Sequence, residues 1–423
     1  MSKDNLVYGI DFGTSNSAVA IIHEDGKSEV LKIDGKQTVP SLIFFPDSEL
    51  GKYYIGYEAI AKYLDSGMKG RFIQSIKSVL PSDLFTGTNI SGFGVLTSED
   101  LVAMILKYLK EKADALSEAD TKSVVIGRPA RFSEKPKLDE LAEERLKAAA
   151  IKAGFTNISF QLEPIAAALH YESTLTKEEL VLVADIGGGT SDFTIMKLSP
   201  DKRDKTNRKK DILASGGVYI GGDSFNSDIM RWKLLKYFGF GSEIKTMSGK
   251  ILPFPSDLLS QICRWQDVSF IKNRETEILL NSIYYESTNK EAVTRLQTLI
   301  GEDLSYLLFQ EIEKAKIGLS SLEQMPIIFN ESKINIDETI IRPEFEELID
   351  DRLKRINDSV EEIIKSAGVS NQTIDAVFIT GGSSLIPAVR DIFAKKFGEE
   401  KIVSSDSFTS VASGLALSSK ILL

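Results

Sequence analysis

The sequence contains the same short pattern twice, and this repeat constrains the fold more than any other feature. Each copy consists of an apolar extended segment, an aspartate, a turn rich in glycine and threonine, and a second extended segment. The first copy runs through residues 6–22 and the second through residues 180–198. An internal repeat at the separation of two domains predicts two similarly built halves. Because strand-like and helix-like segments alternate in each half, we expect an α/β architecture.

At 423 residues the chain is too long for a single hydrophobic core, so two lobes are expected. We predict lobe I at residues 1–183, with an inserted subdomain at about 39–118. Lobe II is predicted at residues 184–423, with an inserted subdomain at about 226–345. Residues 240–310 have little strand character and several helical stretches, so this part of the insertion is expected to be mainly helical.

The two repeated turns have the composition of a site for phosphate and magnesium. Glycine lets the backbone approach phosphate oxygens and present its N–H groups, and a threonine or serine hydroxyl adds a donor. An aspartate at the strand end would bind Mg²⁺ directly or through water, because hard cations prefer oxygen ligands. Two ordinary turns would explain the glycines but not both aspartates. The pattern therefore predicts Asp11 and Asp185 as metal ligands, and phosphate contacts from Gly13, Thr14, Ser15, Gly187, Gly188, Gly189 and Thr190.

Two further carboxylates are candidates for the chemistry. Asp192 follows Thr190 by two residues and would orient the attacking water or accept its proton; the alternative is a solvent-facing aspartate at a strand start. Glu163 precedes Pro164 at the start of a predicted helix and would orient water or magnesium. The alternative for Glu163 is a helix N-terminal carboxylate stabilised by the helix dipole.

Other glycine-rich turns follow extended segments in the second half. Gly216 and Gly217, and then Gly221, Gly222 and Asp223, precede a helical run, and helix N-termini stabilise anions. A third such turn follows the predicted strand at 376–380. We expect the second half to bind a nucleotide through Gly221, Gly222, Asp223, Gly381, Gly382 and Ser383.

The net charge of −10 disfavours binding to nucleic acid or to an anionic membrane. A local exception is the basic cluster at residues 202–210, with Lys202, Arg203, Lys205, Arg208, Lys209 and Lys210. We interpret it as a solvated hairpin loop, with a local basic contact site as the alternative. The single cysteine excludes an intrachain disulfide, and neither a signal peptide nor a membrane-length apolar run is visible. These features predict a cytoplasmic protein.

Six ordered stretches resemble the ATPase domain of the seventy-kilodalton heat-shock chaperones, the DnaK-like family. They are residues 9–14, 124–129, 163–168, 185–192, 221–225 and 379–387. The resemblance implies an actin-like ATPase fold with duplicated ribonuclease H-like lobes and inserted subdomains. It also implies Mg²⁺-dependent binding of ATP or ADP, slow ATP hydrolysis in a cleft between lobes that close on the nucleotide, and a protein partner or co-chaperone.

The resemblance also implies roles for individual residues. By motif position, Thr14 and Thr190 would contact phosphate, while Asp11, Asp185 and Glu163 would surround Mg²⁺ and the water. Asp192 would assist proton removal. Lys77 aligns with the family's lysine that positions the nucleophile near the γ-phosphate; the alternative is a surface lysine on a helix.

Three departures from the family pattern concern the base of the nucleotide. Glu313, Lys316 and Ser320 match the family's adenosine-binding helix, but Ile317 replaces its arginine. Leu385 replaces a second arginine, and Phe408 replaces an acidic residue. Each arginine lost from an adenine face removes about 0.5–2 kcal/mol of cation–π and stacking interaction. We therefore expect altered base recognition, with the phosphate chemistry retained.

The family continues with a linker, a peptide-binding β-sandwich and a helical lid, whereas this sequence stops at Leu423. The resemblance is thus to a short stand-alone form without a peptide-binding domain. Two alternatives share the fold: a sugar-kinase-like phosphotransferase, and a nucleotide-gated scaffold or filament-former with negligible turnover.

Overall fold

The computed structural model describes residues 6–203, 205, 207–246, 248–264, 268, 271–404 and 409–423. These residues form two compact units. Unit 1 comprises Met1–Leu64, Gly70–Gly222 and Leu353–Leu423, and unit 2 comprises Asp65–Lys69 and Asp223–Arg352. The boundary predicted between lobes I and II, after residue 183, lies inside unit 1, and the predicted lobes stay a prediction.

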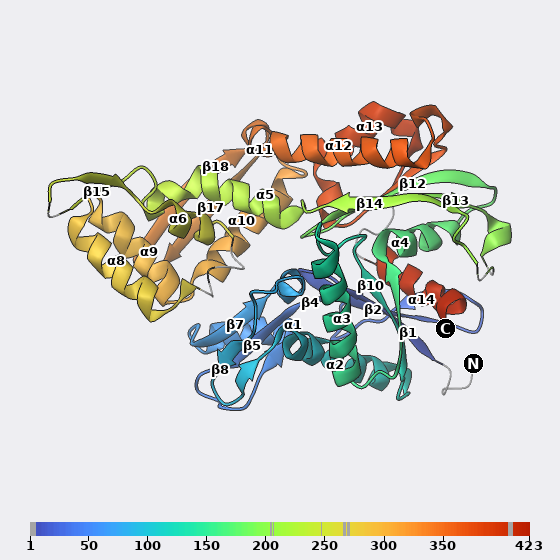
Figure 1. Ribbon diagram of the computed structural model, residues 1–423, viewed down its shortest axis with the longest axis horizontal. Helices are drawn as coiled ribbons and strands as arrows, with labels where there is room; N and C mark the ends of the chain where they lie inside the picture. Colours follow the sequence, from blue (N-terminus) through green and yellow to red (C-terminus); the bar gives the residue numbers. More distant parts are fainter. Residues whose placement is uncertain are drawn as a thin grey trace. The chain divides into compact units, whose positions relative to one another are not determined.

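Unit 1 contains two large sheets with the same strand topology (Figure 1). In each sheet, three antiparallel strands are followed by two parallel strands, so that the spatial orders β3-β2-β1-β10-β11 and β14-β13-β12-β19-β20 correspond position by position. This correspondence confirms the internal repeat read from the sequence. The strands are β1 (Val7–Phe12), β2 (Asn16–Ile22), β3 (Ser28–Val30), β10 (Ser123–Arg128), β11 (Asn157–Leu162), β12 (Glu179–Ile186), β13 (Ser191–Leu198), β14 (Ile212–Val218), β19 (Ala376–Thr380) and β20 (Ile402–Ser404).

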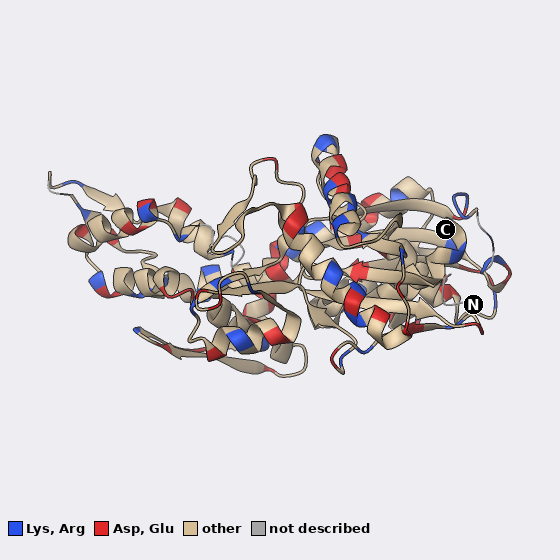
Figure 2. Cartoon of the chain, turned by 90° about the horizontal axis from the view of Figure 1, so that it is seen from below, with Lys and Arg blue, Asp and Glu red and all other residues tan. Residues whose placement is uncertain are grey.

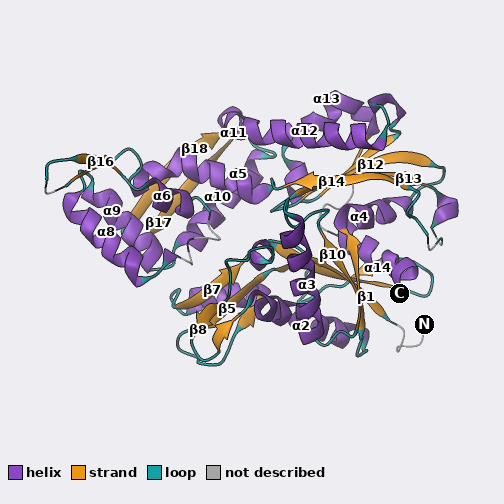
Figure 3. Ribbon diagram, in the orientation of Figure 1, coloured by secondary structure: helices purple, strands orange, loops and turns teal. Residues whose placement is uncertain are grey.

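Helices and small sheets surround these strands (Figure 3). Helix α2 (Ser98–Ser117) begins at a capping box in which Thr97 and Asp100 satisfy each other's backbone N–H groups, as such sequences favour. The other flanking helices are α1 (Gly56–Asp65), α3 (Pro136–Lys152), α4 (Glu163–Glu172), α12 (Asp350–Ala367), α13 (Pro387–Phe397) and α14 (Ser410–Leu422). The small strands are β4 (Val39–Pro40), β5 (Leu42–Pro46), β6 (Tyr54–Ile55), β7 (Gly70–Gln74), β8 (Thr88–Ile90) and β9 (Gly94–Leu96).

Helices α4 and α14 pack against each other and connect the cores of the two sheets. One core cluster contains Val125 of the first sheet, Val181 of the second, Ala167 of α4 and Leu415 of α14, all buried. The two helices approach so closely that a Cβ on Gly414 would overlap the carbonyl oxygen of Ala166. Only glycine fits at such a backbone contact. The crossing therefore holds α4 firmly just after its first turn.

Unit 2 is a mixed region in which the β17–β18 hairpin packs against α10. Two three-residue strands, β15 and β16, pair within the region that was expected to be mainly helical. Strands this short show too little alternation to be read from a sequence. The elements are α5 (Gly222–Ile229), β15 (Glu243–Lys245), β16 (Ile251–Pro253), α6 (Ser256–Ile262), α8 (Arg274–Glu286), α9 (Lys290–Gly301), α10 (Ser305–Leu319), β17 (Gln324–Glu331), β18 (Ile334–Ile341) and α11 (Arg342–Leu348).

The basic cluster at 202–210 lies in the loop between β13 and β14, as predicted, but one member is not solvated. Lys205, Lys209 and Lys210 are exposed, whereas Arg208 is only 5% exposed and forms an ion pair with Glu172. The prediction of a solvated loop is therefore wrong for Arg208. A buried carboxylate on a neighbouring helix explains this difference, and a local pattern of basic residues does not reveal such a partner.

Charged residues of both signs are interspersed along the helices of the chain (Figure 2). In the described ranges, every helix is too short or too polar to span a lipid bilayer.

Candidate functional site

The two repeated turns lie next to each other in unit 1. The first connects β1 to β2 and the second connects β12 to β13. A Cβ on Gly189 would lie 2.9 Å from the hydroxyl oxygen of Thr14, so the second turn passes directly over the first. A side chain at this position would push the two turns apart. Both turns remain partly exposed. The N–H of Gly187 donates to the carbonyl of Thr190 within the second turn.

Two further predicted turns contact the second of these turns. The N–H of Gly222 donates to the carbonyl of Gly187 at 3.0 Å, and the hydroxyl of Ser383 donates to the same carbonyl at 2.9 Å. A Cβ on Gly381 would lie 2.8 Å from a carboxylate oxygen of Asp185. The structure thus brings the turns at 187–190, 221–222 and 381–383 together.

Gly216 and Gly217 do not form a turn before a helix. Both lie within strand β14, so the predicted turn is wrong at these two positions. A Cβ on Gly217 would lie 2.7 Å from a carboxylate oxygen of Asp192, and glycine here leaves space for that side chain.

The predicted catalytic residues lie close enough to one another to interact electrostatically. Nζ of Lys77 contacts Oε1 of Glu163 at 2.6 Å, and both side chains are buried. Asp192 is 2% exposed and accepts a hydrogen bond of 2.8 Å from the N–H of Ala130. The alternatives of a surface lysine at Lys77 and a solvent-facing Asp192 are therefore wrong. Lys77 lies in the short 3-10 helix η2 (Ile76–Val79).

The carboxylates of this cluster have raised pKa values. Burial, followed by the charge of Glu163, raises the pKa of Asp11 to about 7 and that of Asp192 to about 7. The same two causes raise the pKa of Asp185 well above its usual range. Burial alone would lower the pKa of Lys77, but the charges of Glu163 and Asp11 outweigh it and raise that pKa. Four carboxylates, those of Asp11, Glu163, Asp185 and Asp192, thus interact with one lysine, an arrangement that a bound cation would stabilise.

The carboxylates do not form a ready-made metal cage. Within the described ranges, no three Asp, Glu, His or Cys side chains are placed to hold a metal ion together. Mg²⁺ typically keeps several waters and binds one or two carboxylates together with substrate phosphates. Asp11 and Asp185, beside phosphate-type turns, fit that second kind of site, in which the nucleotide supplies the remaining ligands.

The residues predicted to contact adenosine belong to a different unit. Glu313, Lys316 and Ile317 lie on α10 of unit 2, where Nζ of Lys316 contacts Oε2 of Glu313 at 2.6 Å. Ser320 directly follows α10, and Asp223 lies on α5. Ile317 is 60% exposed. These contacts with adenosine stay a prediction.

Leu385 belongs to unit 1 and ends the short 3-10 helix η7 (Gly382–Leu385), with 55% of its surface exposed. Phe408 lies outside the described residues.

Sequence reasoning missed one polar contact within the cluster and one at the far end of helix α4. The first is the N–H of Ala130, which binds Asp192 from 62 residues away, and a backbone donor leaves no signal in a sequence. The second is the ion pair between Glu172 and Arg208. The sequence offers one signal, the acidic Glu172 at the end of the mostly apolar segment 164–171.

The chain resembles known proteins over nearly all of its length. A model of the Hsp70 protein family matches residues 7–297 and 284–423. The chain is 26% identical to the chaperone protein DnaK of Mycoplasma mobile, covering 100% of this chain and 59% of the relative. It is 28% identical to the DnaK of Mycoplasmopsis synoviae, covering 98% and 58%, and 28% identical to that of Thermosipho melanesiensis, covering 100% and 60%.

The chain therefore spans about three fifths of the length of these curated relatives. The duplicated sheets and the family match together confirm the predicted actin-like ATPase fold. Because the family model extends over nearly all of the sequence, the chain belongs to the Hsp70 family.

Proposed function

We propose that the chain binds ATP or ADP with Mg²⁺ and hydrolyses ATP slowly, as a chaperone-like protein. The observation that carries this proposal is that the Gly/Thr turns of both sheets meet each other, and that their aspartates interact with a buried pair of Lys77 and Glu163. Membership of the Hsp70 family, whose members are ATPases, supports the same activity. It favours a chaperone-type ATPase over the phosphotransferase alternative.

The proposed roles follow from the chemistry of the groups present. The N–H groups of the turns, together with the hydroxyls of Thr14 and Thr190, bind the phosphates. Asp11 and Asp185 hold the metal ion, which when bound neutralises negative charge on the transferring phosphoryl group. Lys77, held by Glu163, orients the attacking water.

Asp192 is the proposed general base. A base works best when its pKa lies near the working pH, and the pKa of Asp192 is raised to about 7 by burial and by Glu163. The hydrogen bond from Ala130 holds one of its carboxylate oxygens in place.

Steady-state ATP turnover by the purified chain tests this assignment. Asp11→Asn and Thr190→Ala are each expected to lower kcat by about 100-fold or more, because each removes a group that stabilises developing charge. The exposed Asp47, replaced by asparagine, is the matched control and should leave turnover unchanged. Undiminished turnover in Asp11→Asn or Thr190→Ala would contradict the site.

We further propose that the predicted lobes close on the nucleotide and pass this change to a protein partner or co-chaperone, in the cytoplasm. Hinge closure of domains around a ligand is a common route for such coupling. Limited proteolysis with and without Mg-ATP checks it, since closure should slow cleavage. An unchanged cleavage rate, together with ATP-dependent light scattering, would instead favour the filament-forming alternative.

A further inference from the structure

Helix α4 has a buried glutamate at each end. Glu163 is its first residue and contacts Lys77, whereas Glu172 is its last residue and is only 1% exposed. At 1.5 Å per residue, the two ends lie about 14 Å apart. The residues between them are almost all apolar and buried, so we treat the helix as one rigid element.

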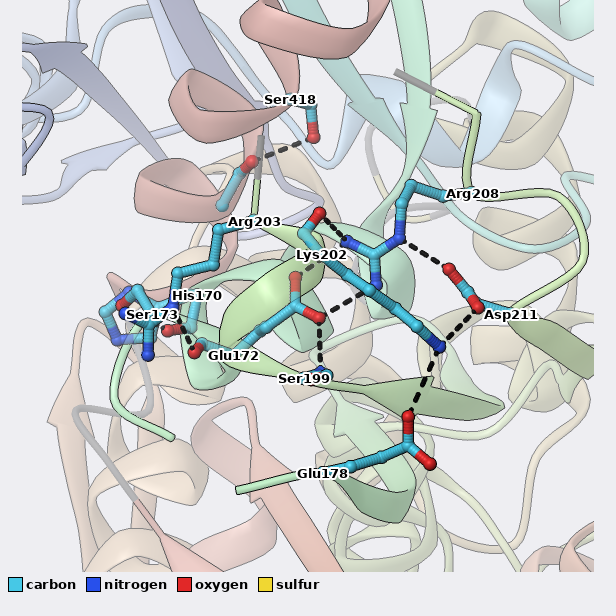
Figure 4. Close-up of polar contacts among 11 residues, drawn as sticks. His170, Glu172, Ser173, Glu178, Ser199, Lys202, Arg203, Arg208, Asp211 and Ser418 are labelled. Carbon is cyan, nitrogen blue, oxygen red and sulfur yellow. Dashed lines mark hydrogen bonds and ion pairs between the residues drawn. The ribbon is translucent and has the colours of Figure 1, made fainter. Parts of the chain in front are cut away.

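The carboxylate of Glu172 is bound from two directions by the β13–β14 loop (Figure 4). Its two oxygens contact Nη1 and Nη2 of Arg208 at 2.7 and 2.8 Å, and Oε1 also accepts the N–H of Ser199 at 2.8 Å. Nε of Arg208 binds Asp211 at 2.7 Å. Such two-point arginine–carboxylate pairs fix direction as well as distance.

The same loop also holds the backbone at the end of the helix. Nε of Arg203 donates to the carbonyl of Glu172 at 3.0 Å, and its Nη2 donates to the carbonyl of Leu175. Lys202 contacts Asp211 at 2.8 Å and Glu178 at 3.6 Å (Figure 4). Arg208 and Arg203 therefore anchor the C-terminal end of α4.

Besides the contacts of Glu163 and Glu172 at its two ends, α4 has a third close contact, between the backbones of Ala166 and Gly414. This contact prevents the helix from shifting sideways near Glu163 but does not prevent a tilt about that point. A displacement of the Glu172 end would therefore move Glu163 relative to Lys77.

We propose that the Glu172–Arg208 ion pair is a positioning device for Glu163, acting through helix α4. This inference rests on the proposed ATPase function, because it assigns the distant pair a role in placing the Lys77–Glu163 contact. Without Arg208, Glu172 is a buried carboxylate lacking its charge partner, which is strongly unfavourable. The end of α4 then moves toward water, and the helix tilts about its contact with α14.

The test compares Arg208→Met with Lys209→Met, which removes the same charge from an exposed neighbour in the same loop. Arg208→Met is expected to lower kcat about tenfold, as misplacement of a catalytic group does, while KM for ATP stays within about twofold. Lys209→Met should match the wild type. Equal kcat values for Arg208→Met and wild type would overturn the proposal, as would an equal loss in both variants.

A double variant separates positioning from a simple loss of packing. Glu172→Leu combined with Arg208→Met leaves no unpaired charge inside the protein, and such replacements are often tolerated. The double variant should therefore recover most of the kcat lost in Arg208→Met. A double variant as slow as the single one would count against positioning by α4. If Arg208→Met does not fold, Arg208→Lys, which retains the charge but not the two-point geometry, takes its place.

Hydrogen–deuterium exchange gives a readout that does not depend on ATP hydrolysis. In Arg208→Met, the amides of residues 163–172 should exchange faster along the whole helix, including the Glu163 end. Faster exchange confined to the Glu172 end would overturn the inference. If the wild type hydrolyses no ATP, the proposed function fails, while this measurement still decides whether Arg208 holds α4.

Discussion

At neutral pH, the carboxylates of Asp11 and Asp192 lower the stability of the protein when no ligand is bound. Their pKa values are about 7 in the folded chain, against an ordinary value of 3.8. A raised pKa means that the folded state binds the proton more tightly than the unfolded state. The stability that this tighter proton binding contributes is fully present below about pH 4. It is lost as the pH rises from about 4 to about 7. A bound cation would offset this loss.

The first prediction concerns Asp192. Replacing it with asparagine removes the titrating group but retains an oxygen that can accept the hydrogen bond from Ala130. The free Asp192→Asn variant should therefore unfold a few degrees higher than the wild type at pH 8, and the difference should shrink at pH 4. Thermal unfolding at both pH values measures it, with Asp47→Asn as the control. A variant less stable than wild type at pH 8 would contradict the prediction.

Site residues that share one turn could be predicted from the sequence. Contacts between residues that are far apart in the sequence could not. Asp11, Thr14 and Thr190 belong to local patterns whose chemistry is legible within a few positions. Lys77 was found only through family resemblance, because its partner Glu163 lies 86 residues away. The predicted solvent exposure of Arg208 is wrong because its burial depends on Glu172, which lies on another element.

Helix α14 packs closely against several other elements. It contacts α4 and also strands β1 and β2, and its Ala412 and Ala416 pack against Ala18 and Ala20. Small side chains at all these positions allow the backbones to approach closely. The position of α4, and with it Glu163, depends on this close approach.

The second prediction tests that crossing. Gly414→Ala should lower the free energy of unfolding by about 3 kcal/mol, because its Cβ would overlap the carbonyl oxygen of Ala166. Gly301→Ala is the control: it ends α9, and a Cβ there meets nothing within 4 Å. That change should be neutral or slightly stabilising. Urea unfolding followed by circular dichroism distinguishes the two; similar midpoints would refute the packing argument.

Most elements of the sheets could be predicted because buried strands are continuous apolar runs between glycine turns, as at 180–184. The helix beginning at Glu163 was predicted from Pro164, which suits the first turn of a helix. The sequence predicts a turn at Gly216 and Gly217 because paired glycines usually mark turns. Here they lie in a strand, where Gly217 leaves space for Asp192.

At the scale of the whole molecule, the two residues that replace family arginines belong to different units. The phosphate turns and Leu385 belong to unit 1, and Ile317 belongs to unit 2. Both aliphatic residues are more than half exposed, and the family resemblance predicts that each replaces an arginine. Apolar contact does not distinguish one purine from another as a directed hydrogen bond does.

The third prediction follows from these two replacements. ATP and GTP should bind with comparable affinity, as measured by calorimetric titration in the presence of Mg²⁺. Ile317→Arg combined with Leu385→Arg should tighten ATP binding, by about 0.5–2 kcal/mol for each restored stacking contact. Strict selectivity for adenine in the wild type would contradict the expectation.

The packing of α14 on the first sheet also has a consequence for protein synthesis. Strand β2 leaves the ribosome early, but the helix that covers its alanines begins only at Ser410. At roughly 5–20 residues per second, the intervening residues take about 20–80 seconds to translate. During that interval the nascent first sheet exposes an apolar face. A protein of a chaperone family would thus itself pass through an aggregation-prone state each time it is made.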